Sequence, residues 1–411
     1  MVRLLVLPLL LLAFLLPSTA QASARPGDVV PGSYIVTLDA EAPAAAVASD
    51  HAGRHGAVVD HVYRHALRGY AARMSASQAR AVAADPRVVA VEQDRVVTTQ
   101  AKPGGDQTAQ AQTLPTGIDR IDGELSSAAS GDGSGAVSVD VAVIDTGIDV
   151  DHPDLNVVGG KNCVRGPNTF DDGNGHGTHV AGTVAAKDDG NGVVGVAPGA
   201  RLWAVRVLDN RGSGTTSSVI CGIDYVTANA STIEVANMSL GGSGTDSVCG
   251  GSDSYHNAIC KSVNAGVTYA VAAGNSAADA STSRPATYDE AITVSALADF
   301  NGKPGGGAAP TCRSDVDDTF ADFSNYGADV DLIAPGVCIN STWLSGGYNT
   351  ISGTSMASPH VAGAAALYKA SNPGASPAQI KSALQATGNS DWNNADDRDS
   401  IKETLLNVAA L

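Results

Sequence analysis

The chain has 411 residues, 43% of them hydrophobic and only 16% charged, and its formal net charge is -17. This composition can fill globular cores, which excludes wholesale disorder, and the 46 glycines follow no three-residue period, which excludes a collagen-like rod. The acidic balance repels phosphate backbones and anionic membranes, so we expect a protein that binds neither nucleic acid nor membranes. Residues 1–100 carry 9 Lys and Arg against 8 Asp and Glu, whereas the rest carries 16 against 34, which indicates a near-neutral N-terminal part and an acidic body.

The first segment, residues 1–24, is typical of a secretory signal peptide. Arg3 precedes an apolar run over residues 4–16, and small residues then continue to Ala24. A run of about 13 residues is shorter than the roughly 20 that cross a bilayer, and AQA or ASA before residue 25 offers a cleavage site. We therefore expect secretion, and no second long apolar run suggests a membrane anchor.

A small α/β unit is predicted over residues 25–98. Its strand-like and helix-like runs alternate along the chain, as in a two-layer α/β domain. The strands are expected at 33–38, 70–74 and 88–92, and the helices at 42–55 and 77–84. The polar stretch 99–113 has no periodicity and contains PGG, so we expect an exposed linker there.

The acidic body, residues 114–411, is predicted to be an α/β domain with a mostly parallel sheet. Its β-rich runs are short and largely apolar without strict alternation, which is typical of strands covered by helices on both faces. The strands are expected at 137–144, 201–208, 233–237, 267–272, 291–296 and 329–333, and helices at 176–186, 216–229 and 354–370. In open sheets of this type, reactive residues gather at the carboxyl ends of the strands.

All six cysteines lie in the acidic body, and an even number in a secreted chain indicates disulfide bonds. None belongs to a C-x-x-C pair, which argues against structural zinc. Six cysteines allow fifteen full pairings. We predict the local loop closures Cys249 with Cys260 and Cys312 with Cys338, and Cys163 with Cys221 then follows by elimination.

Asp145 directly follows the first predicted strand of the body, in the segment VIDTGI. An Asp before Gly is commonly a turn residue that bonds its own backbone. DTG is also the motif of aspartic proteases, but these need two such carboxylates and the sequence holds no second copy. A symmetric homodimer could supply the second, so this class stays open as a minor alternative.

His176 lies in NGHGTHVAG, where glycines on both sides allow close backbone approach and a helix follows. A histidine at a helix start is common, and it indicates a catalytic base only when the sequence also offers a nucleophile. His176 and His179 could together bind a metal, but no glutamate completes an H-E-x-x-H site. We therefore expect His179 to be a packing residue.

Ser355 is the candidate nucleophile, in GTSMASPHVAG at the start of a long Ala-rich helix. Its backbone N–H is unpaired there and can face a developing oxyanion, although a plain helix cap is the common alternative. A lipase-type nucleophile elbow is excluded, because those enzymes place the acid and then the histidine after the serine. Here the only later histidine is His360, with no acid between. The order Asp145, His176, Ser355 is that of the subtilisin arrangement.

With these three motifs in order, the body resembles the subtilases, the subtilisin-like serine peptidases, and looks closest to their proteinase K branch. The resemblance implies the subtilisin-like fold and an endopeptidase that works through an acyl-enzyme, with Asp145, His176 and Ser355 as its catalytic triad. AAGN resembles the oxyanion-hole loop of the family, which implies that Asn275 is the side-chain donor. The competing hypothesis from another class is a secreted binding protein with this fold and a silent site.

The same resemblance implies two backbone edges that pair with an extended substrate strand. One edge also walls the primary specificity pocket, opposite the residues that precede Asn275. Walls of Ala, Gly and Leu imply broad specificity with an apolar or aromatic residue before the scissile bond. The first edge is Ser239, Leu240, Gly241 and Gly242, the opposite wall is Ala272, Ala273 and Gly274, and the second edge is Gly212, Ser213 and Gly214.

A structural calcium ion is also implied by the resemblance. Asp331 matches a calcium carboxylate of the family, and the carbonyl oxygens of Asp289 and Ala291 would be its partners. Catalysis itself needs no cofactor in this family.

The N-terminal unit, residues 25–98, resembles the subtilase prosegment, which helps the catalytic domain to fold and then inhibits it. Its C-terminal end would lie in the active-site cleft as a slow substrate. Self-cleavage between residues 97 and 113 would release the mature enzyme, which we expect to act outside the cell as a monomer on proteins and peptides.

Overall fold

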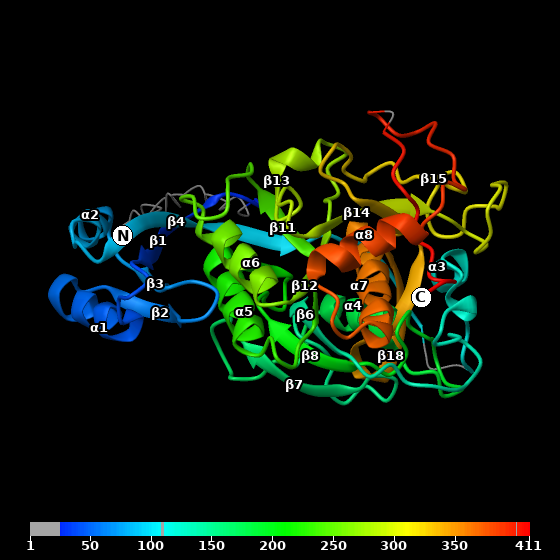
Figure 1. The fold of residues 1–411 in the computed structure, drawn as a ribbon, viewed down its shortest axis with the longest axis horizontal. Coiled ribbons are helices and arrows are strands. Elements are labelled where there is room, and N and C mark those ends of the chain that lie inside the picture. The colour runs from blue at the N-terminus through cyan, green and yellow to red at the C-terminus, as the bar shows by residue number, and fades with distance from the viewer. Residues whose placement is uncertain (1–24, 108–110, 400) are drawn as a thin grey trace, which may run out of the picture.

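The computed structural model describes residues 25–107, 111–399 and 401–411, and Figure 1 labels its elements. The signal peptide expected at residues 1–24 lies outside the described residues. A small N-terminal lobe stands beside a larger body, and the long strand β4 runs from this lobe into the body (Figure 1). Within the described ranges, no helix combines the length and the apolar character that crossing a bilayer requires.

The N-terminal lobe is an antiparallel sheet, in the order β4-β1-β3-β2, with two helices. Ser75 caps the start of helix α2, where its side chain and that of Gln78 form a capping box, and Gly56 caps the end of α1 with a left-handed φ of 70°. The lobe adds one strand, β2, to the predicted elements, and its last strand continues well beyond residue 92. The elements are β1 (Val29–Leu38), α1 (Ala44–His55), β2 (Val58–Tyr63), β3 (Gly69–Arg73), α2 (Ala76–Ala83) and β4 (Val88–Thr99).

The body is built on an eight-stranded sheet in the order β15-β14-β12-β10-β6-β8-β7, with β16 also paired to β14. All pairs are parallel except β14 with β15, so the predicted mostly parallel sheet is confirmed. The strands are β6 (Asp140–Asp145), β7 (Val157–Asn162), β8 (Arg201–Arg206), β10 (Val235–Met238), β12 (Thr268–Ala272), β14 (Ile292–Ala298), β15 (Thr319–Phe320) and β16 (Leu332–Pro335).

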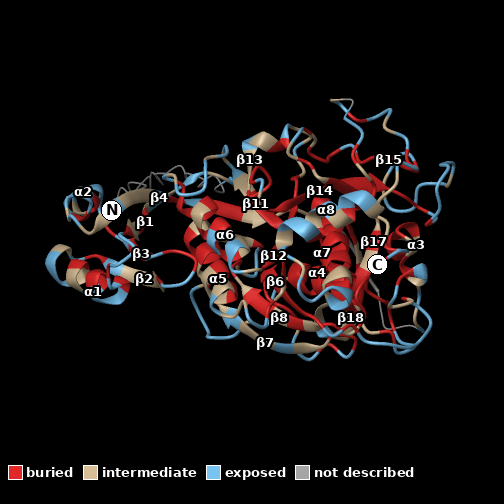
Figure 2. Ribbon diagram, in the orientation of Figure 1, coloured by how far each residue is buried: buried red, intermediate tan, exposed pale blue. Residues whose placement is uncertain are grey.

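Helices cover both faces of this sheet, as Figure 1 shows. Val141 and Val143 of β6 belong to the apolar cluster of α4 and α7, whereas Ala142 and Ile144 belong to that of α5 and α6. Because both faces of the strand are buried, its sequence is apolar without alternation. Buried residues accordingly fill the central strands and helices (Figure 2). The helices are α3 (Thr116–Arg120), α4 (His176–Ala185), α5 (Thr216–Ala228), α6 (Ser254–Asn264), α7 (Thr354–Ser371) and α8 (Pro377–Thr387).

Shorter strands and turns lie outside this sheet. The strands are β5 (Lys102–Gln107), β9 (Ser213–Thr215), β11 (Leu240–Ser243), β13 (Ser283–Arg284), β17 (Ile339–Trp343) and β18 (Gly347–Ser352), and the 3-10 turns are η1 (Gly123–Leu125), η2 (Ala280–Thr282) and η3 (Leu344–Gly346). Strand β5 lies within the stretch predicted to be an exposed linker, and it pairs antiparallel with β18. This strand was not predicted, because an edge strand held by main-chain hydrogen bonds needs no apolar periodicity.

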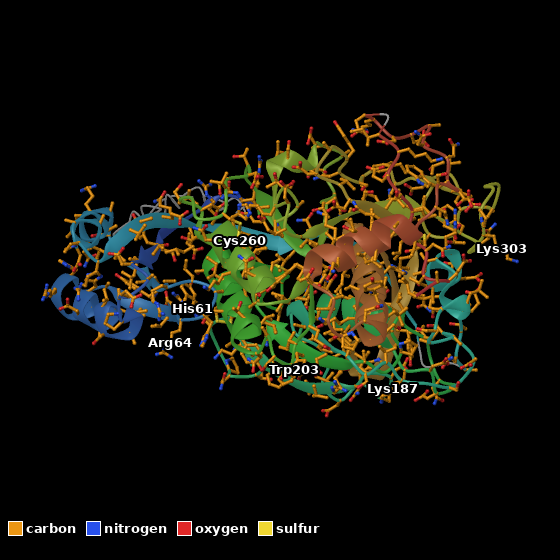
Figure 3. All side chains as sticks on the ribbon, in the orientation of Figure 1. His61, Arg64, Lys187, Trp203, Cys260 and Lys303 are labelled. Carbon is orange, nitrogen blue, oxygen red and sulfur yellow. A yellow bond between two sulfur atoms is a disulfide. The ribbon has the colours of Figure 1, made fainter. Side chains whose placement is uncertain are left out.

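The prosegment-like lobe docks through its sheet on helices α5 and α6. Tyr34 and Val36 face the lobe's own helices, whereas Ile35 joins the apolar cluster of α5 and α6. Asp224 of α5 accepts hydrogen bonds from the backbone N–H groups of Arg64 (3.0 Å), His65 (2.6 Å) and Ala66 (2.8 Å). Figure 3 labels His61 and Arg64 at this junction. The lobe therefore rests on the body by a buried sheet face and by a loop tied to one carboxylate.

Candidate active site

Strand β6 lies where the strand order changes direction, since the chain adds β7 and β8 on one side of it and β10, β12 and β14 on the other. The carboxyl ends of strands at such a switch point form the usual crevice of an open α/β sheet. Asp145 is the last residue of β6 and is fully buried. The fold therefore places this carboxylate at the position expected for a site residue.

Asp145 and His176 form a buried pair. Asp145 Oδ1 accepts a hydrogen bond from the N–H of Thr146 at 2.7 Å and lies 2.7 Å from His176 Nδ1. A Cβ at Gly177 would collide with the carbonyl of Gly147, so the glycine lets the first turn of α4 approach the Asp145 loop. Because Nδ1 faces the carboxylate, Nε2 is the ring nitrogen left for proton transfer, and in the described structure it is buried without a partner.

His179 has a different environment on the same helix. Its Nε2 donates to the carbonyls of Ile339 and Asn349, both at 3.0 Å. Burial lowers its pKa to about 3. The ring is a neutral packing residue that ties α4 to the β17–β18 hairpin.

Ser355 is the second residue of α7 and is fully buried. Its backbone N–H donates to the carbonyl oxygen of Gln100 at 3.1 Å, and its hydroxyl donates to the carbonyl of Ser239 at 3.0 Å. The free helix-terminal N–H predicted from the sequence is thus occupied by a carbonyl of the chain itself. The hydroxyl points to Ser239 and not to His176.

Asn275 follows the wall residues Ala272, Ala273 and Gly274 at the end of β12. Its Oδ1 accepts hydrogen bonds from the N–H and the hydroxyl of Thr354, both at 2.9 Å, which fixes the orientation of the amide. A Cβ placed on Gly353 would collide with the Gln100 carbonyl oxygen and would lie 3.0 Å from Asn275 Nδ2. The Gln100 carbonyl oxygen therefore contacts the Ser355 N–H, and it and Asn275 Nδ2 both border the space beside Gly353.

The two predicted substrate edges hold strand β4 between them. Thr98 and Thr99 pair antiparallel with β11, and residues 96–98 pair antiparallel with β9. Beyond the strand pairs, Thr99 N–H donates to the Gly212 carbonyl at 3.0 Å and Gln100 N–H donates to the Ser239 carbonyl at 3.3 Å. Residues 239–242 and 212–214 thus act as edges for an extended segment, and that segment is the chain's own.

Three side chains that support this site, Asn237, Thr354 and Ser358, were not singled out as site residues from the sequence. Ser358 Oγ donates to Asn237 Oδ1 at 2.7 Å, Asn237 Nδ2 donates to Ser239 Oγ at 2.8 Å, and Ser239 Oγ donates to the Ser355 carbonyl at 2.7 Å. This buried chain of hydrogen bonds joins β10 and β11 to the start of α7. The only sequence signal was the position of Asn237 at a strand end and of Thr354 beside Ser355.

The three predicted calcium ligands also lie together, but the group between them is an ammonium. Lys381 Nζ lies 2.8 Å from Asp331 Oδ2, and it donates to the carbonyls of Asp289 at 3.0 Å and Ala291 at 2.9 Å. These oxygens therefore do not fit a calcium ion in the presence of Lys381.

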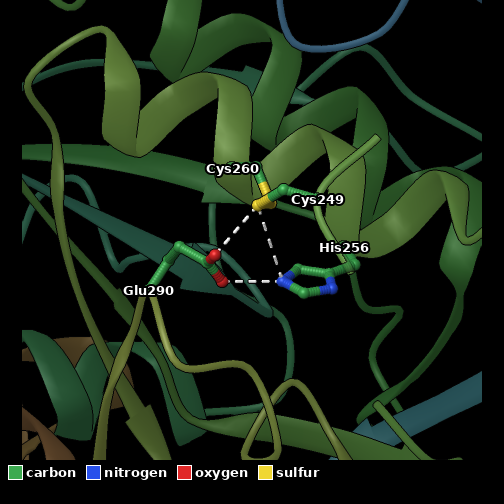
Figure 4. Close-up of side chains that lie close together, drawn as sticks. All are labelled: Cys249, His256, Cys260 and Glu290. Carbon is green, nitrogen blue, oxygen red and sulfur yellow. Dashed lines mark hydrogen bonds and ion pairs between the residues drawn. A yellow bond between two sulfur atoms is a disulfide. The ribbon is translucent and has the colours of Figure 1, made fainter. Parts of the chain in front are cut away.

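All three predicted disulfides are present, Cys163–Cys221, Cys249–Cys260 and Cys312–Cys338, and no described cysteine is free. Figure 4 shows Cys249–Cys260 beside His256 and Glu290. Glu290 lies 2.6 Å from His256 Nε2 and 2.9 Å from Cys249 Sγ. Because both sulfurs are bonded to each other, this group offers no thiolate ligand.

Comparisons with known proteins agree with this architecture. Residues 137–402 match the Subtilase family, and residues 33–100 match the Peptidase inhibitor I9 family. Subtilisin DY of Bacillus licheniformis is 41% identical over 303 residues, which cover 73% of this chain and 99% of the relative. Subtilisin E of Bacillus subtilis is 41% identical over 74% of this chain and 71% of its own length.

Two further relatives extend the comparison. Alkaline serine exoprotease A of Vibrio alginolyticus is 39% identical over 87% of this chain, which spans only 61% of the length of that enzyme. A solved cold adapted subtilisin-like serine proteinase has a TM-score of 0.56 and 36% identity, over 71% of this chain and 97% of its own. The placement in the proteinase K branch stays a prediction. The chain belongs to the subtilase family of serine endopeptidases and carries an N-terminal prosegment of the peptidase inhibitor I9 family.

Proposed function

We propose that the chain is a zymogen that cuts its own bond between Gln100 and Ala101 and then hydrolyses proteins and peptides with the same residues. The observation that carries this proposal is the 3.1 Å hydrogen bond from the Ser355 N–H to the Gln100 carbonyl oxygen. A carbonyl held by the amide of the nucleophile is in the position of a scissile carbonyl. The sequence had limited the cut only to residues 97–113.

The proposed roles follow from the donors and acceptors at the site. Ser355 Oγ attacks the carbonyl carbon of Gln100 while His176 Nε2 takes the hydroxyl proton. Asp145 Oδ1 accepts from Nδ1 at 2.7 Å, which holds the ring and stabilises the imidazolium. The oxygen that becomes negative is stabilised by the Ser355 N–H and the Asn275 amide. The C–N bond then breaks, and the proton on His176 passes to the amine of Ala101.

Hydrolysis of the acyl-enzyme repeats these steps with water. His176 takes a proton from the water, whose oxygen attacks the ester carbon, and the proton then returns to Ser355 Oγ as the ester bond breaks. Before the first attack the Ser355 hydroxyl has to turn from the Ser239 carbonyl to His176 Nε2. Catalytic hydrogen bonds are often unformed outside the reacting complex, and the unpartnered Nε2 supports this rotation.

After the cut, the prosegment is expected to remain bound as an inhibitor. Its β4 strand stays paired with both edges, and Gln100 becomes the carboxyl end that occupies the oxyanion position. On the other side of the bond, Lys102–Gln107 pairs with β18, so the new amino end stays attached to the peptidase domain. The product complex thus keeps nearly all the contacts of the precursor.

Substrate selection is proposed to rest mainly on backbone pairing and on an apolar anchor three residues before Gln100. Val97 is 2% exposed and belongs to the same apolar cluster as Leu208 and Leu240. The residue before the proposed cut is glutamine and not the apolar or aromatic residue expected from the pocket walls. We therefore propose broad specificity at that position and a preference for aliphatic residues at the Val97 position.

Secretion is proposed from chemistry as well as from the leader-like residues 1–24. Three disulfides persist only in an oxidising compartment. A secreted zymogen that remains inhibited until its prosegment is removed also protects the producing cell from its own peptidase.

The test is labelling of the mature enzyme with a fluorophosphonate, which modifies an activated serine. The wild-type protein and a control with the exposed Ser134→Ala substitution should be labelled at Ser355, and Ser355→Ala should be neither labelled nor processed during purification. Absence of labelling in processed wild-type protein would favour the alternative, a binding protein with a silent site. Processing of purified Ser355→Ala without added enzyme would refute self-cleavage.

A further inference from the structure

The oxygens expected to bind calcium surround the side-chain ammonium of Lys381. Nζ lies 2.8 Å from Asp331 Oδ2, 3.0 Å from the Asp289 carbonyl and 2.9 Å from the Ala291 carbonyl. An ammonium has three N–H donors and no acceptor, so each donor has one oxygen. The lysine side chain is 23% exposed and the Asp331 side chain 15%, so this pair is largely shielded from water.

Backbone hydrogen bonds hold the oxygen atoms around Lys381 Nζ in place independently of the lysine. The Asp331 N–H donates to the Thr293 carbonyl, and the Thr293 N–H donates to Asp331 Oδ2, both at 2.9 Å. The Ala291 N–H donates to the Tyr288 carbonyl at 3.0 Å, which closes the turn that carries both carbonyl acceptors. The oxygens are therefore held in place by the start of β14 and remain there if the cation is removed.

The lysine is delivered by helix α8. Ser376 caps the start of this helix with a capping box, a proline follows in the first turn, and the helix residues Ile380 and Leu384 are buried in the main core. Packing of these two residues directs the following positions toward Asp331. Gln385, one turn after Lys381, brings its Nε2 to 3.4 Å from Asp331 Oδ1 and from the Asp331 carbonyl.

A calcium ion fits this arrangement poorly as long as the lysine is present. Calcium takes six to eight oxygens at about 2.3–2.6 Å, whereas three protein oxygens converge here at hydrogen-bond distances from a positively charged nitrogen. The metal would have to share these oxygens with a like charge. We propose that the ammonium of Lys381 is a built-in cation that takes the place of a divalent metal at this site, and that removing it opens a divalent cation site.

This exchange changes how the region responds to its surroundings. A bound metal stabilises a fold only in proportion to its free concentration, whereas a tethered ammonium cannot diffuse away. The contacts of Lys381 Nζ join the turn before β14, the start of β16 and helix α8. The segment before this turn contains β13, which pairs with the specificity edge β11. This region beside the specificity pocket should therefore keep its stability in chelator.

The experiment uses the full chain with Ser355→Ala as parent, so that self-digestion does not interfere. Lys381→Met removes the charge and keeps an unbranched side chain suited to a helix. The matched control is Lys369→Met on α7, because Lys369 Nζ donates to a single carbonyl, that of Ala375, at 2.9 Å. The probes are calcium chloride alone, with bound calcium per chain measured by calorimetry, and Tm with and without chelator.

Lys381→Met should bind one more calcium ion per chain than the parent and gain a calcium-dependent increase in Tm, and the control should behave as the parent. Adding Asp331→Asn to Lys381→Met should abolish the extra ion. In the parent, Asp331→Asn should leave the number of bound calcium ions unchanged. A loss of one calcium ion in the parent with Asp331→Asn would overturn the proposal, even if Lys381→Met failed to fold. A folded Lys381→Met that gains no calcium would also overturn it.

Discussion

Asp94 anchors the prosegment to the start of helix α5, and its removal should weaken inhibition strongly. Its carboxylate accepts hydrogen bonds from the Ser217 N–H at 2.9 Å, the Ser217 hydroxyl at 2.6 Å and the prosegment's own Ser33 hydroxyl at 3.0 Å. Asp94 is 1% exposed and Ser217 is 5% exposed, so water cannot replace the lost acceptor in the complex. The positive end of the helix also favours a carboxylate at this position.

The expected loss of binding free energy follows from the two hydrogen bonds between Asp94 and Ser217. Each hydrogen bond to a charged group contributes about 1.5–3 kcal/mol net of hydration. Asp94→Ala should therefore weaken prosegment binding by about 2–4 kcal/mol, because the bonds share one carboxylate and are not additive. At 1.4 kcal/mol per factor of ten, this is a rise of roughly 30- to 1,000-fold in the inhibition constant. Asp94→Asn keeps the shape and should cost less.

The assay is inhibition of the mature enzyme by added prosegment, followed with a chromogenic peptide. Glu41→Ala is the control, since Glu41 is an exposed prosegment carboxylate. A double-mutant cycle with Ser217→Ala on the enzyme isolates the contact from any effect on the folding of the prosegment. An inhibition constant for Asp94→Ala within about threefold of wild type, or no coupling with Ser217→Ala, would refute this reasoning.

Two further predictions concern catalysis and pH. Asn275→Ala should lower kcat by roughly a hundred- to a thousandfold with KM nearly unchanged. This size is taken from the same kind of substitution in a subtilisin. A large rise in KM at constant kcat would instead make Asn275 a substrate-binding residue. Glu403 is 4% exposed with both carboxylate oxygens unpartnered, and burial raises its pKa to about 8 from a usual 4.5. The folded state then holds a proton that the unfolded chain releases, so stability present below pH 4.5 is lost as the pH rises to 8. Denaturant titrations of Ser355→Ala protein measure the free energy of unfolding. Adding Glu403→Gln should raise it by up to about 4 kcal/mol at pH 8 and by little at pH 4.5. An equal difference at both pH values would contradict this burial effect.

The fold was predictable where local sequence patterns and packing agree. Val141 to Ile144 are apolar on both faces of β6, so the buried parallel strand was visible in the sequence. Strand β2 was missed because most of its side chains are only half-buried and include His61 and Asp60. Strand β5 was missed because its partner β18 lies far along the chain, and such pairing leaves no periodicity in either segment.

The site was predictable at the level of motifs and not at the level of contacts. Short local motifs were enough to identify Asp145, His176 and Ser355 and their order. Closeness along the chain was enough to predict the local cysteine pairs. The proposed scissile bond depends on the register of β4 between two edges, which places Gln100 and no neighbour at the Ser355 N–H. The calcium expectation considered the oxygens alone, whereas Lys381 reaches them from a helix 90 residues beyond Ala291.

The most direct test of self-processing is the mass of both fragments when purified precursor is allowed to mature. The account predicts one first cut, which yields a prosegment fragment ending at Gln100 and a peptidase beginning at Ala101, and no cut in Ser355→Ala. A first cut at any other bond would contradict the placement of the Gln100 carbonyl at the nucleophile.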